Sequence, residues 1–326
     1  MHRWSRHLIF GISLLLFGFL LAACSSDLGT DSTIDVRSSN YKIDLHFVGQ
    51  GFTAERRQIF LDAATRWASI ITGDLPSVTL NQPQKDICGF GEGAISGTID
   101  DLLIIAIIGE IDGKGKILGA AFPSLVRRGN ELTAIGCMVF DSADIAELSE
   151  EELPNIVLHE MGHVLGIGSF WQPLNGFNSR NMLEFRTNSF MQACNSAKSF
   201  SQKPLFLGDQ ANREWQALGK TGKVPVEDEY GVGTQCSHWD EGIFAHELMT
   251  GFSNEGEMPL SRLTIASLAD LGYEVDFSKA DPYQLPTCLT TCLHLQEAQH
   301  QEPWELVFAP RGMIDANGTV SPLDNP

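Results

Sequence analysis

The chain has 326 residues, of which 43% are hydrophobic and 19% are charged, and its formal net charge is −19. This composition is typical of a globular protein and excludes a disordered or low-complexity chain. The strong negative charge argues against nucleic acid or an anionic membrane surface as a binding partner, because both would repel the protein. The length suffices for one large domain or two modest ones.

The first 23 residues have the layout of an export signal. Arg3 and Arg6 precede an uncharged apolar run, 8–23, which is shorter than the roughly 20 residues of a membrane-spanning helix. The run ends in Leu-Ala-Ala-Cys, which resembles the lipobox of bacterial lipoproteins, in which the Cys becomes the lipidated first residue. We therefore expect Cys24 to carry lipid and to anchor an exported protein to the bacterial cell envelope, with Ser25 favouring the outer membrane or cell surface. A plain cleaved signal is the alternative.

The remaining cysteines are Cys88, Cys137, Cys194, Cys236, Cys288 and Cys292. An even number of cysteines in an exported chain suggests up to three disulfides. Chain order alone gives the pairs Cys88–Cys137, Cys194–Cys236 and Cys288–Cys292. The alternative is that some of them are free, buried thiols.

After a polar stretch at 24–40, which we interpret as a flexible tether, the chain alternates between strand and helix patterns. The expected elements are a strand at 41–48, an amphipathic helix at 53–71, a buried strand at 102–108 and two further strands at 117–122 and 133–140. Residues 167–237 are rich in Gly, Asn and Ser and are predicted to be irregular. A helix is expected at 261–271, and a partly disordered tail after Pro286.

His159, Glu160, Met161, Gly162 and His163 form the pattern H-E-x-x-H. On a helix, residues four apart lie on one face, so two imidazoles can bind one metal ion. The Glu between them is placed to accept a proton from a metal-bound water rather than to bind the metal. The alternative is that the pentapeptide occurs by chance and that both histidines are merely buried.

Signals for a helix flank this pattern. Ser149 and Glu152 have the spacing of a capping box, and Pro154 suits the first turn of a helix. Gly166, three residues after His163, is placed to end the helix in a sharp turn. That turn would let a third metal ligand approach from elsewhere in the chain.

The third ligand is not adjacent to the motif. Ser169 stands where the compact H-E-x-x-H-x-x-G-x-x-H pattern has a His, and a Ser hydroxyl is a poor zinc ligand. The candidates further along are Glu184, His238, His246, His294 and His300. Glu184 lies near the spacing of thermolysin-like enzymes. His238 is the better candidate, because it lies in Ser-His-Trp-Asp and Met249 follows it in Glu-Leu-Met-Thr-Gly.

This combination resembles the leishmanolysin-type metzincins, peptidase family M8, over roughly residues 41–285. In that family a long insertion displaces the third His, which precedes a Met that packs beneath the metal. The resemblance implies one catalytic Zn²⁺ bound by His159, His163 and His238, with Met249 as the Met-turn residue. Eukaryotic members carry a long pro-segment whose Cys blocks the zinc, and the short stretch after Cys24 makes that mode of inhibition doubtful here.

The resemblance implies an α+β, metzincin-like fold with a mixed twisted sheet and an active-site helix. We divide the chain into a signal peptide (1–23), the tether (24–40), an N-terminal catalytic subdomain (41–166), a loop-rich C-terminal subdomain with the third ligand (167–286) and a tail (287–326).

The implied activity is that of a zinc-dependent endopeptidase in which Glu160 is the general base and the partner is a protein or peptide substrate. By resemblance to metzincins, the substrate would add to the strand at 117–122, and the alternative is that this strand lies inside the sheet. Two other functions stay open: a non-catalytic surface lipoprotein on the same fold, and a thermolysin-like hydrolase that uses Glu184. Nothing in the sequence indicates the oligomeric state.

Overall fold

The computed structural model describes residues 33–37, 40–149, 151–172, 181–184, 203–231, 233–253, 256–287 and 305–323. The predicted export signal and Cys24 lie outside the described residues, and so do Cys194, Cys288, Cys292, His294 and His300. Within the described residues, no helix is both long enough and apolar enough to cross a membrane.

The described strands build one large mixed sheet in the order β1-β2-β5-β7-β6-β12-β13, with β11 also paired to β6. Its strands are β1 (Thr33–Arg37), β2 (Lys42–Val48), β5 (Leu102–Gly109), β6 (Gly119–Arg127), β7 (Thr133–Asp141), β11 (Glu305–Val307), β12 (Gly312–Ile314) and β13 (Val320–Pro322). The neighbours β2, β5 and β7 run parallel to one another, and β6 runs antiparallel to β7. The α+β class with a mixed sheet is thus as predicted.

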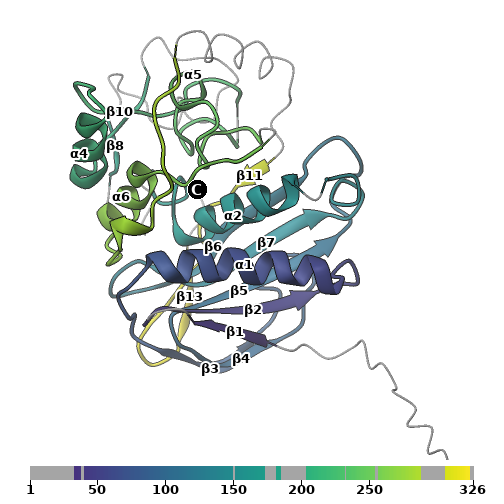
Figure 1. Cartoon of the computed structure of the whole chain (residues 1–326). Helices are drawn as coiled ribbons and strands as arrows, with labels where there is room; N and C mark the ends of the chain where they lie inside the picture. The colour runs from purple at the N-terminus through teal and green to yellow at the C-terminus, as the bar shows by residue number, and fades with distance from the viewer. Residues whose placement is uncertain are drawn as a thin grey trace, which may run out of the picture. The chain divides into compact units, whose positions relative to one another are not determined.

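Two helices, α1 (Ala54–Ile70) and α2 (Glu152–Leu165), cover one face of this sheet, and the hairpin β3 (Val78–Gln84) and β4 (Ile95–Ile99) lies on the other (Figure 1). In β5, Ile104 and Ala106 join the core beneath the helices, while Ile105 and Ile107 join the core on the hairpin side. Burial on both faces explains the uninterrupted apolar run of this strand.

The first helix is placed by its cap and by one long-range hydrogen bond. Thr53 caps α1, because its hydroxyl accepts from the Arg56 N–H at 3.2 Å. Trp67 is fully buried and its indole N–H donates to the Leu158 carbonyl in α2 at 2.9 Å. The indole therefore ties the two helices together directly below the H-E-x-x-H segment.

The part of the chain after α2 is less regular. It contains a small sheet of β8 (Leu183–Glu184), β9 (Leu205–Phe206) and β10 (Val224–Pro225), the helices α4 (Asp209–Ala217), α5 (Glu241–Phe244) and α6 (Arg262–Leu271), and a 3-10 turn at Phe277–Lys279. Helix α6 was predicted and starts at the Ser261 cap. Helix α4 was not, and the expectation of irregular structure there is wrong. Only Ala211 and Trp215 of this nine-residue helix are buried, so its apolar face is too short to stand out in a stretch rich in Gly, Asn and Ser.

Three other expectations need correction. Residues 33–37 of the expected tether form β1, which pairs with β2. The tail was expected to be partly disordered, and its residues 305–323 contain the strands β11, β12 and β13. Strands of three to five residues in polar surroundings carry too little periodicity to be recognised. The tail strands pair with β6, so the candidate edge strand at 117–122 is an inner strand here.

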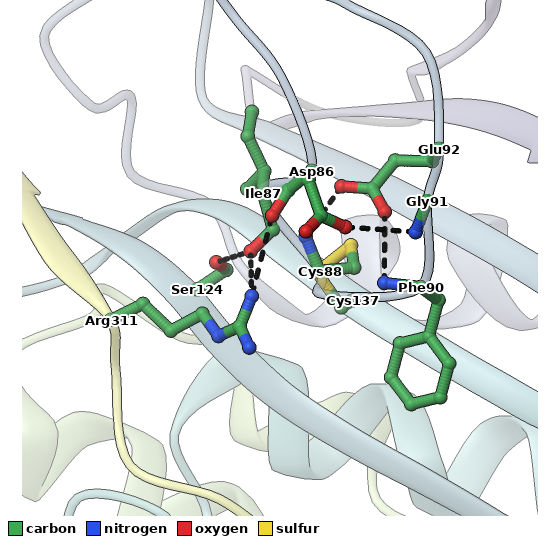
Figure 2. Close-up of a disulfide and its surroundings, with 9 residues drawn as sticks. All are labelled: Asp86, Ile87, Cys88, Phe90, Gly91, Glu92, Ser124, Cys137 and Arg311. Carbon is green, nitrogen blue, oxygen red and sulfur yellow. Dashed lines mark hydrogen bonds between the residues drawn. A yellow bond between two sulfur atoms is a disulfide. The ribbon is translucent and has the colours of Figure 1, made fainter.

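The pair Cys88–Cys137 was predicted and is confirmed, with a Cα–Cα distance of 5.7 Å. It joins the turn after β3 to the middle of β7, on the sheet face away from the helices (Figure 2). Within the turn, Glu92 accepts from the Cys88 N–H at 2.5 Å, and Asp86 accepts from the Gly91 N–H at 2.8 Å. Cys236 is also disulfide-bonded. Its pairing with Cys194 stays a prediction.

Candidate metal centre

The ends of α2 are fixed by the residues that flank the motif. The Ser149 hydroxyl accepts from the Glu152 N–H at 3.2 Å, and the Glu152 carboxylate accepts from the Ser149 N–H at 2.9 Å. This reciprocal pair is the predicted capping box. At the other end Gly166 has φ 112°, and a Cβ there would lie 2.1 Å from the Phe170 ring. Only Gly fits both the backbone conformation and this close contact.

Three imidazoles converge from two distant segments of the chain. The Nε2 atoms of His159 and His163, one helical turn apart, are separated by 2.9 Å. The Nε2 of His238 lies 3.0 Å from that of His163 and 3.3 Å from that of His159. All three side chains are buried. In the described residues they are the one group of histidines that could hold a metal ion.

The other ring nitrogens are oriented by backbone carbonyls. His159 Nδ1 lies 2.6 Å from the Leu248 carbonyl oxygen, and His163 Nδ1 lies 2.8 Å from that of Ile167. His238 Nδ1 lies 3.0 Å from the Thr234 carbonyl oxygen. A carbonyl can only accept, so each Nδ1 carries the hydrogen and each Nε2 presents a lone pair.

This arrangement fits a cation. Three lone pairs that face one another at these distances repel unless a positive ion lies between them. Neutral imidazoles are common zinc ligands, and zinc–nitrogen distances of about 2.0–2.1 Å in a tetrahedron put nitrogens about 3.3 Å apart. Three protein ligands leave the fourth position of a tetrahedral ion open, as in catalytic zinc sites.

Glu160 lies between the two helical ligands in the sequence and is fully buried. Burying a carboxylate is costly unless it is paired, hydrogen-bonded or close to a metal ion, so its position beside the three imidazoles makes Glu160 a candidate functional residue.

The turn after α2 brings His238 to the helix. Gly168 packs so closely on the other segment that a Cβ there would lie 2.1 Å from the Ser237 carbonyl oxygen. Ser169 donates its hydroxyl hydrogen to the His163 carbonyl at 2.9 Å. The residue that replaces the His of the compact pattern therefore caps the helix instead of ligating.

Beneath the ligands lies the segment around Met249. The Trp239 N–H donates to the Met249 carbonyl at 3.0 Å, which joins this segment to the one that carries His238. The Glu247 carboxylate accepts from the Met249 N–H at 2.7 Å, from the Ser261 hydroxyl at 2.6 Å and from the Thr264 hydroxyl. Burial raises the pKa of Glu247, and these donors oppose the rise. Glu247 thus connects the Met segment to the start of α6.

The third ligand is also held by aromatic packing and buried charge. The Trp239 ring packs on Trp171 with centroids 4.4 Å apart. Lys203 forms ion pairs with Asp228 and Asp240. Burial and the nearby Asp240 charge raise the pKa of Glu227 to about 8, and hydrogen bonds from the backbone N–H groups of Glu241 and Glu229 oppose that rise. The loop around His238 is therefore held by an aromatic contact at Trp239 and by an ion pair at Asp240.

The competing ligand candidates lie elsewhere. Glu184 forms an ion pair with Lys223 and is not part of the histidine group. His246 is only partly buried and does not belong to the group either. His294 and His300 lie outside the described residues.

Sequence reasoning missed the groups that orient the imidazoles. The carbonyls of Leu248, Ile167 and Thr234 leave no signal in a sequence, because every residue has a carbonyl. Glu247 could have been noticed, since it is an acidic residue within an apolar stretch just before Met249.

Comparison with known proteins agrees with this geometry. A family model described as Leishmanolysin, peptidase M8, matches residues 89–298. The chain is 27% identical over 204 residues to leishmanolysin from Leishmania donovani, which covers 60% of this chain and 32% of that protein. It is 29% identical over 151 residues to leishmanolysin from Leishmania major, and this match covers 45% of this chain and 23% of that protein.

A leishmanolysin homolog from Crithidia fasciculata is 27% identical over 153 residues, which covers 47% of this chain and 22% of the homolog. The chain thus spans about a third or less of the length of the curated relatives it matches. The family model, however, covers more than half of the chain and includes all three histidines. The chain therefore belongs to the leishmanolysin family, peptidase family M8.

Proposed function

We propose that this protein is a zinc-dependent endopeptidase with a metzincin-like active site. One observation supports this most: the Nε2 lone pairs of His159, His163 and His238 converge within 3.3 Å beside the buried Glu160. The curated relatives are named leishmanolysin. Because the chain matches only part of their length, the activity is carried over as a proposal.

In this mechanism His159, His163 and His238 hold the zinc. A bound zinc supplies a Lewis acid that polarises the scissile carbonyl and lowers the pKa of water to about 7. Glu160 accepts the proton of the attacking water and then passes it to the leaving amine. Met249 packs below the site, and Gly166 turns the chain so that the third ligand can approach.

The division into a catalytic subdomain (41–166) and a C-terminal subdomain (167–286) is part of this proposal. The substrate chain would then bind beside the three histidines, where α2 and the segment around His238 meet. Export and lipid attachment at Cys24, with anchoring to a bacterial envelope, are proposed from the sequence of the first 24 residues. The anchor is tested by growing cells with labelled palmitate. The processed wild-type protein should carry the label, and Cys24→Ala should not.

The activity is tested with a casein digest of the zinc-loaded protein. We expect cleavage that stops when a chelator removes the metal and returns when zinc is added back. Glu160→Gln should keep its zinc and lose cleavage by at least about 100-fold, the usual contribution of a general base. Glu151→Gln, an exposed position at the start of the same helix, is the matched control and should cleave normally.

A zinc-loaded wild-type protein that leaves casein intact would contradict the proposal and favour a binding protein on the same fold. Full activity of Glu160→Gln would remove Glu160 from the mechanism while leaving the metal site in place.

A further inference from the structure

The strand next to α2 is covered along its outer edge by the end of the chain. Residues Gly119–Ala121 of β6 pair in parallel with β11, and Leu125–Arg127 pair in parallel with β12. The tail strands, yellow in Figure 1, thus lie on the side of β6 that faces away from β7. At Gly119–Ala121 and Leu125–Arg127, the edge of β6 is therefore already paired with the tail.

The segment covered by β11 lies level with the metal centre. Val164, near the end of α2, is so close to Gly136 of β7 that a Cβ there would lie 2.2 Å from it. His159 precedes Val164 by five residues, which is a distance of about 7.5 Å along the helix axis. The same distance along a strand corresponds to about two residues. That places His159 level with Met138, whose partner in β6 is Ala121.

The direction of α2 supports this placement. Strand β7 runs from Thr133 to Asp141, and α2 follows it in the chain and packs back over it. The Thr133 hydroxyl, at the start of β7, donates to the Val164 carbonyl in the last turn of α2. The helix therefore runs antiparallel to β7 and in the same direction as β6. Ala121 pairs with Met138 on one side and with Val307 of β11 on the other.

The two tail segments differ in how firmly they are held. Next to β12, the Arg311 N–H donates to the Ser124 carbonyl at 2.9 Å, and its guanidinium donates to the carbonyls of Asp86 and Ile87 at 3.3 Å (Figure 2). A Cβ at Gly89 would lie 2.3 Å from this guanidinium, so the turn and the tail interlock. Met313 and Ile314 of β12 are buried.

The β11 segment is described mainly through its backbone pairing with β6. It is three residues long, and next to it the Phe308 ring contacts the Phe122 ring, with centroids 5.2 Å apart. Phe308 is 43% exposed. A parallel ladder of three residues beside a partly exposed ring is short enough to detach while the buried β12 stays bound.

We infer that Glu305–Val307 occupies the strand edge on which a peptide substrate would be held, so that substrate and the chain's own tail compete for β6. The inference rests on the proposed endopeptidase function. Strand addition uses main-chain hydrogen bonds, which any extended peptide can make. The tail would therefore raise the KM of every substrate that adds to this edge.

The test uses the full-length protein with the double substitution Leu306→Pro and Val307→Pro. Successive strand residues point their N–H groups in opposite directions, so at least one of these prolines removes a donor that faces β6. Ser321→Pro in β13 is the control, because it places a proline in the same tail without touching the β11 pairing.

Two quantities are measured: casein digestion kinetics, and hydrogen exchange of the amides of Gly119–Ala121. We expect the double variant to lose exchange protection at those amides of Gly119–Ala121 that face β11, while the amides that face β7 and those of α2 keep theirs. Its KM should fall about tenfold, which is the effect of a segment that is docked in roughly nine-tenths of the molecules. The control should match the wild type in both measurements.

An unchanged KM despite lost protection would overturn the inference, because the edge would then be unused by substrate. Equal exchange in wild type and double variant would overturn it too, because β11 would not cover β6 in solution. If neither protein digests casein, the protease assignment itself fails, and the exchange measurement still reports separately on the β11 pairing.

Discussion

The sulfur of Met249 lies against Gly162, inside the H-E-x-x-H segment: a Cβ at position 162 would lie 2.8 Å from the sulfur atom. Gly162 stands between the two helical histidines, and Met249 follows the Leu248 carbonyl that orients His159. The absence of a side chain at one position therefore lets the Met segment support the metal centre from below. Met249 and Gly162 therefore depend on each other: the Met side chain fills the space that the Gly leaves open.

Gly162→Ala should be harmful although Ala is the better helix former by about 1 kcal/mol. The added methyl group overlaps Met249, and overpacking of this kind costs about 1–3 kcal/mol. The Met segment must shift, and the Leu248 carbonyl shifts with it. We expect a lower unfolding temperature and weaker zinc binding, measured by thermal unfolding and by competition with a chromogenic chelator.

Gly129→Ala is the matched control for that substitution, because a Cβ there would meet no atom within 4 Å. Unchanged zinc affinity in Gly162→Ala would show that the contact with Met249 does not help to position the ligands.

Glu247→Ala should be strongly destabilising. Its carboxylate accepts from the Met249 N–H and from the hydroxyls of Ser261 and Thr264, and these buried donors would lose their acceptor. Each unsatisfied buried group costs about 1–3 kcal/mol, so we expect a loss of about 3 kcal/mol or more in the free energy of unfolding.

Glu247→Gln keeps one acceptor oxygen and should lose less, whereas Glu257→Ala, at an exposed position, should lose almost nothing. Urea unfolding of the three variants provides the measurement. Equal stability of Glu247→Ala and Glu257→Ala would disprove the connecting role of Glu247.

Asp141 should make the stability depend on pH in the acid range. Burial alone would raise its pKa, but the N–H groups of Gly113, Ala143, Ile111 and Asp112 donate to the carboxylate and lower the pKa to about 2. The folded-state pKa lies below the ordinary value, so the stabilisation is present above about pH 4 and is lost as the pH falls towards 2. The amount is on the order of 1–2 kcal/mol.

Asp141→Asn should lower the free energy of unfolding at pH 7 and should flatten its decline between pH 4 and pH 2. Asp62→Asn, at an exposed position on α1, serves as the control and should leave the slope unchanged. Metal-free protein is used throughout, so that release of zinc in acid does not contribute. An equally steep decline in Asp141→Asn would show that the four hydrogen bonds are not the cause.

Much of the fold could be predicted wherever burial leaves a pattern in the sequence. The run at 102–108 is apolar throughout because β5 is covered on both faces, and Thr53, Ser261 and Gly166 mark helix ends as capping chemistry requires. The strands β1, β11, β12 and β13 could not be predicted. They are only three to five residues long, too short to show a clear period. The pairing of β11 and β12 with β6, far away in the chain, is a main-chain interaction that leaves almost no trace in the residues themselves.

The metal-binding residues were predictable because a metal demands particular side chains. His159 and His163 can be recognised from their spacing of four residues. His238 lies 75 residues after His163, and only the resemblance of its surrounding sequence to the family distinguished it from the other candidates. The carbonyls that fix the imidazole tautomers, and the Glu247 cluster below, are products of folding. They form only where the Met249 segment packs against α2 in the folded chain.

The most direct test of the account is the zinc content of three proteins after dialysis: wild type, His238→Ala and His246→Ala. We expect one tightly bound zinc per wild-type chain and per His246→Ala chain. His238→Ala should bind zinc more than about 100-fold more weakly, since even an outer partner of a ligand is worth 10- to 100-fold. One tightly bound zinc in His238→Ala would contradict the account, because the three-histidine site would then not be the metal centre.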